Sequence, residues 1–407
     1  MTGTRRDQFV IYRGLLLQIM AAVPIGIVIG ALDTLFGRVL IYVSSIRESH
    51  YLWLVPFLPI AGAGFMYLYT KYGKSCTKGM SLIFEAGQRK ADKIPLLMIP
   101  FAIIGTWLTH LFGASAGREG VAVQIGGTIA HGIGRKMRFA DSDRVLLIAG
   151  IAAGFAGLFQ TPIAAVFFSM EVLTAGVLEY GALLPALAAA YASSLTSHYL
   201  GLEKFAYSLN FSMPFNLMMV IKLVILGCIF GIAGRAFSYT LHRFKKRLVN
   251  LMGSPVKRIF FAGILISAFS LIFQGRYSGL GTNLIAASFD SSTLPYDFAL
   301  KFLFTIVTLA AGFQGGEVTP LFAIGASLGA ILAPLLGLPV TFAAALGYIA
   351  LFASASNTMI APVFIGAEVF GFAFLPYFFA VSAIAYCVNG NRSIYSLQKV
   401  YISRDEL

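Results

Sequence analysis

Charged residues are scarce in this sequence. Asp, Glu, Lys and Arg make up 12% of the 407 residues, whereas hydrophobic residues make up 58%. Soluble domains carry about 25% charged residues, so this composition excludes an ordinary soluble protein. Cysteine is also rare, and the three that are present, Cys76, Cys228 and Cys387, are widely spaced. That spacing suggests neither a disulfide framework nor a metal site, and we expect no metal and no cofactor.

Signatures of an enzyme and of an attached domain are also lacking. The sequence contains no HExxH pattern, which marks metalloproteases, and its five histidines are scattered. Two carboxylates, described below, could serve acid–base chemistry. An intramembrane enzyme is therefore kept as a distant alternative to the interpretation developed below. No soluble tail of any size follows the last apolar segment. We therefore expect residues 1–407 to form a single transmembrane domain without a soluble regulatory domain.

Long apolar runs are the dominant feature that is present. Several are long enough to cross a hydrocarbon layer of about 30 Å as helices. The clearest runs cover residues 52–69, 94–112, 145–170, 217–234, 259–274 and 359–388. The sequence therefore predicts an all-α polytopic membrane protein.

The basic residues lie mostly between the apolar runs. The formal net charge is +13, and one cluster of Lys and Arg covers residues 243–247. Lys and Arg accumulate in cytoplasmic loops, and Arg5, Arg6 and Arg13 precede the first run, so we expect a cytoplasmic N-terminus. Nucleic-acid binding is the usual alternative for a basic chain, but no basic domain stands apart from the membrane segments. No nucleic-acid partner is expected.

The two halves of the sequence resemble each other at three places. GMSLI, which begins at Gly79, resembles GTNLI 202 residues later, and GRE, which begins at Gly117, resembles GGE 198 residues later. Thr161-Pro162 resembles Ala361-Pro362, 200 residues later. Many transporters consist of two such repeats, with the substrate site between them. The sequence matches alone leave open whether the repeats are parallel or inverted.

The matching segments are interrupted by glycine and proline. Such interruptions within apolar segments suggest broken helices, which persist at membrane depth only where protein or a watery cavity covers them. The start of a helix carries unsatisfied N–H groups and a partial positive charge, so it can bind an anion. Glu119 could occupy such a site as a tethered anion, or it could cap its own helix and pair with Arg118. Membrane carboxylates are costly and usually functional, which favours the first interpretation.

Four segments resemble one known family when they are taken in order. GREGVAVQ (117–124) is similar to the GREGP motif of the CLC family of anion channels and anion/proton exchangers. Residues 154–171 resemble the long inner helix that follows that motif, and GGEVTP (315–320) stands where the family has GxFxP. RSIYS (392–396) resembles the C-terminal stretch with the anion-coordinating tyrosine.

The resemblance spans almost the whole chain and implies a fold. It implies a CLC-type fold of two inverted helical repeats with broken helices around a central anion path. The first repeat would cover about residues 50–200 and the second about 215–400. It also implies a homodimer with one transport path in each subunit.

Several departures from the family pattern point to one branch. They are Met80 in place of the anion-binding serine, Val121 in place of the proline of GREGP, Glu317 and Thr319 within GxFxP, and Val172 in place of the second of two adjacent glutamates, of which Glu171 is kept. Together they resemble the CLC-F branch, the bacterial fluoride/proton antiporters. The resemblance implies export of fluoride from the cytoplasm in exchange for protons, across a bacterial inner membrane.

Two carboxylates would carry the proton coupling. Glu119 matches the gating glutamate, which blocks the path as an anion and leaves it when protonated. Glu317 would repel a passing anion, which is sensible only if it carries protons or accepts a hydrogen bond from a protonated substrate; as a purely structural residue it would be held by nearby N–H groups. Two carboxylates close together in a low dielectric titrate as a coupled pair. Glu171 could be a structural acid near the dimer face or the cytoplasmic side, and the sequence does not assign its role.

Four further residues would line the anion path. Thr319 and Tyr395 supply hydroxyl donors, which a strongly hydrated ion such as fluoride needs when it is buried; Thr319 could instead bond its own helix. Met80 could reshape or gate the path, although methionine commonly fills gaps in cores. Phe84 could turn its positive ring edge to the ion, with ordinary packing as the better-supported role. A chloride channel or chloride/proton exchanger of the same fold is the alternative function, and Met80, Glu317 and Val172 argue against it.

Overall fold

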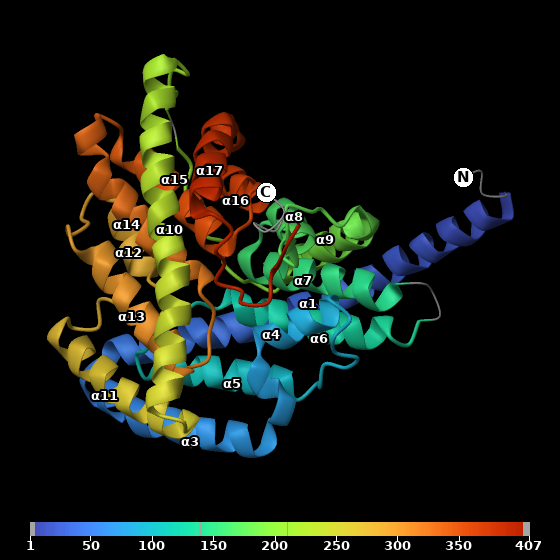
Figure 1. The fold of residues 1–407 in the computed structure, drawn as a ribbon, viewed down its shortest axis with the longest axis horizontal. Coiled ribbons are helices and arrows are strands. Elements are labelled where there is room, and N and C mark those ends of the chain that lie inside the picture. Colours follow the sequence, from blue (N-terminus) through green and yellow to red (C-terminus); the bar gives the residue numbers. More distant parts are fainter. Residues whose placement is uncertain (1–4, 138–140, 210, 402–407) are drawn as a thin grey trace.

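The computed structural model describes residues 5–137, 141–209 and 211–401. Almost every regular element in this part is a helix (Figure 1). The helices of the first half, with 3-10 helices labelled η, are α1 (Arg5–Ser49), α2 (Tyr51–Leu54), η1 (Val55–Phe57), α3 (Leu58–Tyr72), η2 (Lys74–Lys78), α4 (Met80–Gly87), α5 (Met98–Leu111), α6 (Glu119–Gly134), α7 (Ser142–Phe159), α8 (Pro162–Glu171), η3 (Tyr180–Ala182) and α9 (Leu183–Tyr199).

The second half of the chain also consists mainly of helices. Its helices are α10 (Leu217–Leu251), α11 (Pro255–Ile272), α12 (Thr282–Phe289), α13 (Asp297–Ala311), α14 (Val318–Leu332), η4 (Pro334–Leu336), α15 (Val340–Ser356), α16 (Ile360–Phe370), η5 (Phe372–Phe374) and α17 (Leu375–Asn389). The two strands, β1 (Thr174–Ala175) and β2 (Lys399–Val400), pair in parallel. This pair attaches the C-terminal segment to the loop after α8.

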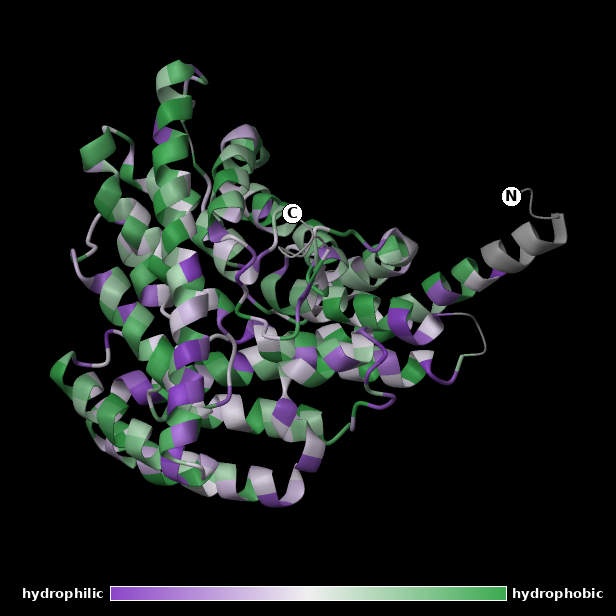
Figure 2. Cartoon of the chain, in the orientation of Figure 1, coloured by the Kyte–Doolittle hydropathy of each residue, from purple (hydrophilic) through white to green (hydrophobic). Residues whose placement is uncertain are grey.

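Six segments of the described chain are long and apolar enough to cross a membrane. They are Arg13–Ser49, Tyr51–Tyr72, Ser142–Phe159, Leu217–Leu251, Pro255–Ile272 and Phe372–Asn389. Figure 2 shows hydrophobic residues over the outward sides of the long helices and hydrophilic residues gathered along one end of α10. Large apolar side chains such as Ile232 of α10 and Phe261 of α11 are more than half exposed. Lipid chains would cover these side chains in a multi-pass membrane protein, which confirms the predicted class.

Two of the predicted spans are broken. The apolar run 145–170 is divided between α7 and α8 by Gln160 and Thr161, and Gln160 has a left-handed backbone with φ of 54°. The run 359–388 is divided between α16 and α17 by Gly371 and η5, and Gly371 has φ of 117°. The interpretation of each run as one span was therefore wrong, because the residues around both breaks are mostly apolar and the hydropathy of the run continues across them.

The order of the helices repeats along the chain. The segments α3 to α9 recur in order and in similar length as α11 to α17, at a spacing of about 200 residues. The long helix α1 packs on α5, α7 and α9, and the long helix α10 packs on their counterparts α13, α15 and α17. Because α1 matches α10, we propose that the first repeat begins with α1, ahead of the boundary near residue 50 expected from the sequence.

The two repeats meet at equivalent loops. The backbone N–H of Gly117 donates to the carbonyl oxygen of Gly316 at 2.6 Å, and the N–H of Gly316 donates to that of Gly117 at 2.8 Å. This antiparallel bridge places a local two-fold axis between the halves, as in inverted repeats. It also brings the first residues of α6 and α14 together at the centre of the molecule.

Glycines allow close contact within the two central helix pairs. A Cβ on Gly126 of α6 would lie 2.0 Å from the carbonyl oxygen of Gly150 in α7. A Cβ on Gly325 of α14 would lie 2.1 Å from the carbonyl oxygen of Gly347 in α15. Small residues at helix contacts are typical of membrane proteins, because they let backbones approach. The buried helices α7 and α15 thereby fix the directions of α6 and α14.

We expect Gly126→Ala to destabilise the protein. The added methyl group would overlap the α7 backbone, and overpacking of this kind costs about 1–3 kcal/mol or more. Gly132 lies on the same helix, and nothing lies within 4 Å of the Cβ that it would gain. Gly132→Ala is therefore the matched control and should be neutral. Size-exclusion chromatography after heating in detergent gives both melting temperatures, and equal values for the two variants would contradict this account of α6–α7 packing.

Candidate functional site

The side chain of Glu119 lies at the start of the opposite repeat's helix. Glu119 is the first residue of α6 and is 1% exposed. Its Oε1 accepts a hydrogen bond from the hydroxyl of Thr319 at 2.5 Å, and its Oε2 accepts one from the backbone N–H of Thr319 at 3.2 Å. Thr319 is in the first turn of α14. Glu119 therefore caps α14 rather than its own helix.

The charge of this carboxylate is balanced from two directions. The N-terminus of α14 contributes the positive end of a helix dipole, which favours an anion there. The backbone N–H of Arg118 also donates to Oε2 at 3.2 Å, and Nε of Arg118 lies 3.8 Å from Oε1. The Arg118 side chain is 12% exposed. The glutamate thus occupies a position that could hold a small anion.

The local chain path depends on glycine. A Cβ on Gly315, which has φ of +147°, would lie 2.4 Å from the Cβ of Ala116. A Cβ on Gly117 would lie 3.0 Å from the carbonyl oxygen of Gly316 and 3.1 Å from Oε2 of Glu119. Larger residues at these positions would push the two loops apart. The glycines that bracket the two acidic motifs therefore allow the repeats to meet.

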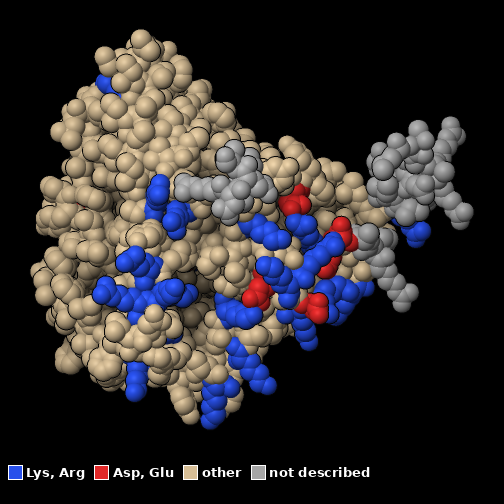
Figure 3. Space-filling model, in the orientation of Figure 1, with Lys and Arg blue, Asp and Glu red and all other residues tan. Residues whose placement is uncertain are grey.

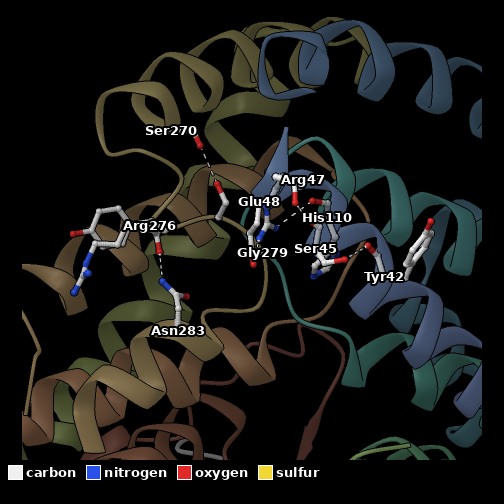
Figure 4. A network of polar contacts seen from close by, with 12 residues as sticks. Tyr42, Ser45, Arg47, Glu48, His110, Ser270, Arg276, Gly279 and Asn283 are labelled. Carbon is white, nitrogen blue, oxygen red and sulfur yellow. Dashed lines mark hydrogen bonds and ion pairs between the residues drawn. The ribbon is translucent and has the colours of Figure 1, made fainter. Parts of the chain in front are cut away.

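A polar network holds the loop that leads to Glu119. Figure 4 shows Arg47, His110 and Gly279 close together; Nη1 of Arg47 donates to the carbonyl oxygen of His110 at 3.3 Å. The ring nitrogens of His110 lie 2.8 Å from the Thr106 carbonyl oxygen and 3.1 Å from that of Ala116. Since Ala116 precedes Gly117, the network fixes the segment just before the bridge between the repeats.

A cavity of about 360 Å³ lies beside the two acidic motifs. Four residues predicted for the path line it: Met80, Phe84, Glu317 and Tyr395. Gly120 and Gln124, which follow Glu119 on α6, line it as well. The structure thus gathers all six predicted site residues in two adjoining places: Glu119 and Thr319 are bonded to each other, and the other four lie in the cavity wall.

Basic side chains surround the cavity. Its lining includes Lys78, His242, Lys245 and Arg258. Figure 3 shows Lys and Arg gathered on the face that carries one end of α10 together with α4 and α6. Glu317 is the one acidic residue in this lining, so positive charge prevails there, and a cavity with such an excess raises the local concentration of anions. This arrangement favours an anion as the occupant.

Met80, Phe84 and Tyr395 form one wall of the cavity. Met80 is the first residue of α4, and Gly79 before it has φ of +53°. Phe84, one turn later, packs against Tyr395 with ring centroids 5.3 Å apart. The backbone N–H of Tyr395 donates to the hydroxyl of Ser393 at 3.1 Å. The start of α4 and the C-terminal segment therefore meet in this wall of the cavity.

Glu317 and Thr319 have different surroundings although they are two residues apart. Glu317 is the N-cap of α14, and its side chain lies in the cavity wall. Among the described residues, no side chain or neighbouring backbone group forms a hydrogen bond or ion pair with its carboxylate. Thr319, in contrast, is 5% exposed and is bonded to Glu119. Thr319, rather than Glu317, makes the direct link to the first repeat.

Two glutamates that cap helices across the repeats lie away from the cavity. Glu171, at the end of α8, accepts hydrogen bonds from the backbone N–H groups of Met359, Ile360 and Ala361 at the start of α16. Glu368, near the end of α16, accepts them from Ile163 and Ala164 at the start of α8. Sequence reasoning missed Glu368. Its position 197 residues after Glu171 was the signal that could have identified it.

Two stretches of the chain fit the GxSxG pattern of serine hydrolases, at 113–117 and 325–329. Ser115 and Ser327 are both 0% exposed. The hydroxyl of Ser115 is hydrogen-bonded to that of Thr305 at 2.9 Å. In hydrolases the serine sits on an exposed turn between a strand and a helix, so neither stretch forms a nucleophile.

In the described residues no group of three or more His, Cys, Asp or Glu side chains is placed to hold a metal ion.

Comparison with known proteins gives consistent results. Residues 61–390 match the sequence model of the voltage gated chloride channel family. A "chloride/fluoride channel protein" of Pseudomonas syringae pv. tomato is 38% identical over 388 residues, covering 92% of this chain and 85% of that protein. The crystal structure of a CLC-type fluoride/proton antiporter is 50% identical, with a TM-score of 0.93, covering 95% of this chain and 98% of the other.

A more distant structure has the same fold. The crystal structure of a slow cyanobacterial Cl⁻/H⁺ antiporter superposes with a TM-score of 0.82 at 21% identity, covering 93% of this chain and 96% of the other. The predicted fold of two inverted helical repeats is therefore confirmed. The match over residues 61–390 and the 38% identity to a relative over nearly the whole chain lead to one conclusion: this protein belongs to the voltage-gated chloride channel family, the CLC family.

Proposed function

We propose that this protein is a fluoride/proton antiporter, which exports fluoride from the cytoplasm in exchange for protons. The observation that carries the proposal is the carboxylate of Glu119 at the N-terminus of α14, where the N–H and hydroxyl of Thr319 donate to it. An anion site occupied by a tethered, protonatable anion is what coupled exchange requires. The resemblance to a CLC-type fluoride/proton antiporter at 50% identity supports the choice of ions. The protein is then a secondary active transporter and not an enzyme.

The exchange follows from the titration of Glu119. As a carboxylate it fills the anion site and blocks the path. When it takes up a proton, it loses its attraction to the α14 N-terminus and to Arg118, and it leaves. A fluoride ion can then accept the hydrogen bonds of Thr319. Return of the deprotonated side chain displaces the ion, so one group couples the two movements.

The cavity residues would guide and select the ion. Lys78, Lys245 and Arg258 attract anions into the cavity. Tyr395 and Thr319 would supply hydroxyl donors to fluoride, whose strong hydration must be replaced on burial. Met80 has a thioether where the resembled family has a serine hydroxyl donor. The ring of Phe84 lies in the same wall and would narrow the cavity. Glu317 would exchange protons with the ion path from the opposite side of the cavity.

We further propose a homodimer in a bacterial inner membrane, with the N-terminus in the cytoplasm. The resemblance to the CLC-F branch supports the dimer and the location. The basic face around the cavity supports the orientation, because Lys and Arg concentrate on the cytoplasmic side of membrane proteins. In this orientation fluoride enters the cavity from the cytoplasm.

We expect purified protein in liposomes to release fluoride at least about tenfold faster than chloride, a difference of about 1.4 kcal/mol in barrier height. The reason is that strong, short hydrogen bonds from Thr319 favour the smaller ion. Ion-selective electrodes measure the initial efflux of each anion from matched vesicles. Vesicles without protein, and vesicles with the Glu119→Gln variant, provide the baselines. Chloride efflux as fast as fluoride efflux would replace this assignment with a chloride channel or chloride/proton exchanger.

A further inference from the structure

Asp33 is a carboxylate that the mechanism above leaves unused. It lies in the middle of α1 and is 0% exposed. Among the described residues it is the one buried carboxylate whose two oxygens both lack a hydrogen-bond partner. Ionisable residues inside a membrane protein are costly and usually functional. An unpaired one in a helix that packs on the centre of the first repeat needs a physical explanation.

The surroundings of Asp33 form a small polar spot. A Cβ on Gly157 of α7 would lie 2.6 Å from Oδ2 of Asp33 and 2.4 Å from Oγ of Ser193 in α9. The Ser193 hydroxyl is also fully buried and has no hydrogen-bond partner in the described chain. Three helices, α1, α7 and α9, therefore bring polar groups to one place where glycine leaves room for them.

Arg118 connects this spot to Glu119. Arg118 is the N-cap of α6, which packs against α1, and its positive charge acts on Asp33. Nε of Arg118 has no hydrogen-bond partner there, and it lies 3.8 Å from Oε1 of Glu119. The guanidinium thus lies beside Glu119, its positive charge also acts on Asp33, and its Nε forms no hydrogen bond with either carboxylate. It can serve as the counter-ion of either.

The two carboxylates cannot both be charged in this arrangement without cost. An ionised carboxylate with no partner in a low dielectric costs several kcal/mol. Glu119 has two donors from Thr319 and is suited to be the anion, whereas Asp33 has none. Asp33 therefore holds a proton in this conformation, and Glu119 holds the negative charge.

We propose that Asp33 is a second proton-binding residue of the transport cycle, on the Arg118 side of Glu119. The proton on an Oδ atom of Asp33 passes, through water at the partly exposed guanidinium, to an Oε atom of Glu119. Asp33 becomes the anion paired with Arg118, and Glu119 becomes neutral and leaves α14. The net charge of the three side chains is zero before and after. The inference rests on the proposed antiport, since it supplies the proton that releases Glu119.

The first test measures the proton on Asp33 without transport. Infrared spectra of the purified protein at neutral pH should contain a protonated-carboxyl band that Asp33→Asn removes. Ser197→Ala is the control, because it removes a buried hydroxyl one turn away on α9 whose bond is to the Ser194 carbonyl oxygen. If Asp33→Asn does not fold, Asp33→Ser serves in its place. An unchanged band would mean that Asp33 is ionised, which overturns the inference whether or not the protein transports fluoride.

The second test asks whether Asp33 acts through Glu119. Asp33→Asn should slow proton-coupled fluoride exchange in liposomes at least about tenfold, within the range of lost proton-transfer groups. A missing proton donor should matter less as the pH falls, because Glu119 can then take a proton directly from water, so the loss should shrink at low pH. A loss of the same size at every pH would show a purely structural role and overturn the inference. If wild-type protein moves no fluoride while the infrared band behaves as expected, the proposed function fails and the proton on Asp33 stands.

Discussion

We expect proton-coupled fluoride exchange to stop when Glu119 is replaced by Gln, while the protein still folds. Glutamine keeps the shape of the side chain and an oxygen that accepts from the Thr319 hydroxyl. It carries no charge and takes up no proton, so it cannot alternate between blocking and leaving the anion site. Loss of a proton-transfer group costs about 10²–10⁴ in rate, and here it removes the coupling step itself. A pH-sensitive dye inside liposomes under a fluoride gradient measures the coupled proton flux.

The matched control for this change is Glu203→Gln. Glu203 is exposed and lies outside the cavity lining, so this variant should transport like the wild type. Val172 makes the experiment more decisive. It stands where the resembled family has a glutamate for internal proton transfer, so that proton acceptor is missing here. A Glu119→Gln protein that still moves protons uphill, driven by fluoride, would show that the proton travels by another route.

Glu317→Gln should give a folded protein with slow fluoride turnover, and Glu317→Ala should be slower still. Glu317 lies in the cavity wall at the start of α14, close in sequence to Thr319. A carboxylate there must take up a proton or gain donors when an anion passes, because two like charges in a low dielectric repel strongly. Glutamine keeps the volume and some hydrogen bonding but cannot ionise. We expect a loss of about 10²-fold for Glu317→Gln, typical of an acid–base residue.

Initial fluoride efflux from liposomes measures the effect of both Glu317 variants, and size-exclusion chromatography in detergent tests their assembly. Asp290→Asn is the control, since Asp290 is an exposed acid that follows α12 on the surface. Native assembly with wild-type transport rates and intact proton coupling in both variants would leave Glu317 without a role in the cycle.

The meeting of the two acidic loops at the centre could be predicted, because similar motifs occur at corresponding positions in the two repeats. GRE and GGE lie 198 residues apart, and the structure joins these loops through Gly117 and Gly316. The motifs therefore identified the loops that meet, and chemistry identified the hydroxyl and carboxylates in them. The sequence did not specify the hydrogen bond between Thr319 and Glu119. It suggested Thr319 as a donor to the ion or to its own helix, whereas in this conformation Thr319 donates to Glu119.

Other features were missed because they depend on packing in three dimensions. The proline at position 162 suggested a broken helix, but α7 and α8 are equally apolar, so the hydropathy pattern does not place the break at Gln160. Asp33 stands alone in the apolar helix α1, and its lack of a partner is visible only once α7 and α9 are in place. The capping role of Glu368 depends on where α8 begins, about 200 residues earlier.

The contacts between the halves have a consequence for how such a fold can arise. At the Gly117–Gly316 bridge and at the two glutamate caps, each repeat makes the same kind of contact with the other repeat. A contact of this kind is self-complementary, as in a two-fold symmetric pair of identical subunits. A half-length chain that inserts into the membrane in both orientations would make the same bridge and the same caps with a second copy of itself. Joining two such copies end to end keeps every one of these contacts, and it then lets the two acidic motifs diverge.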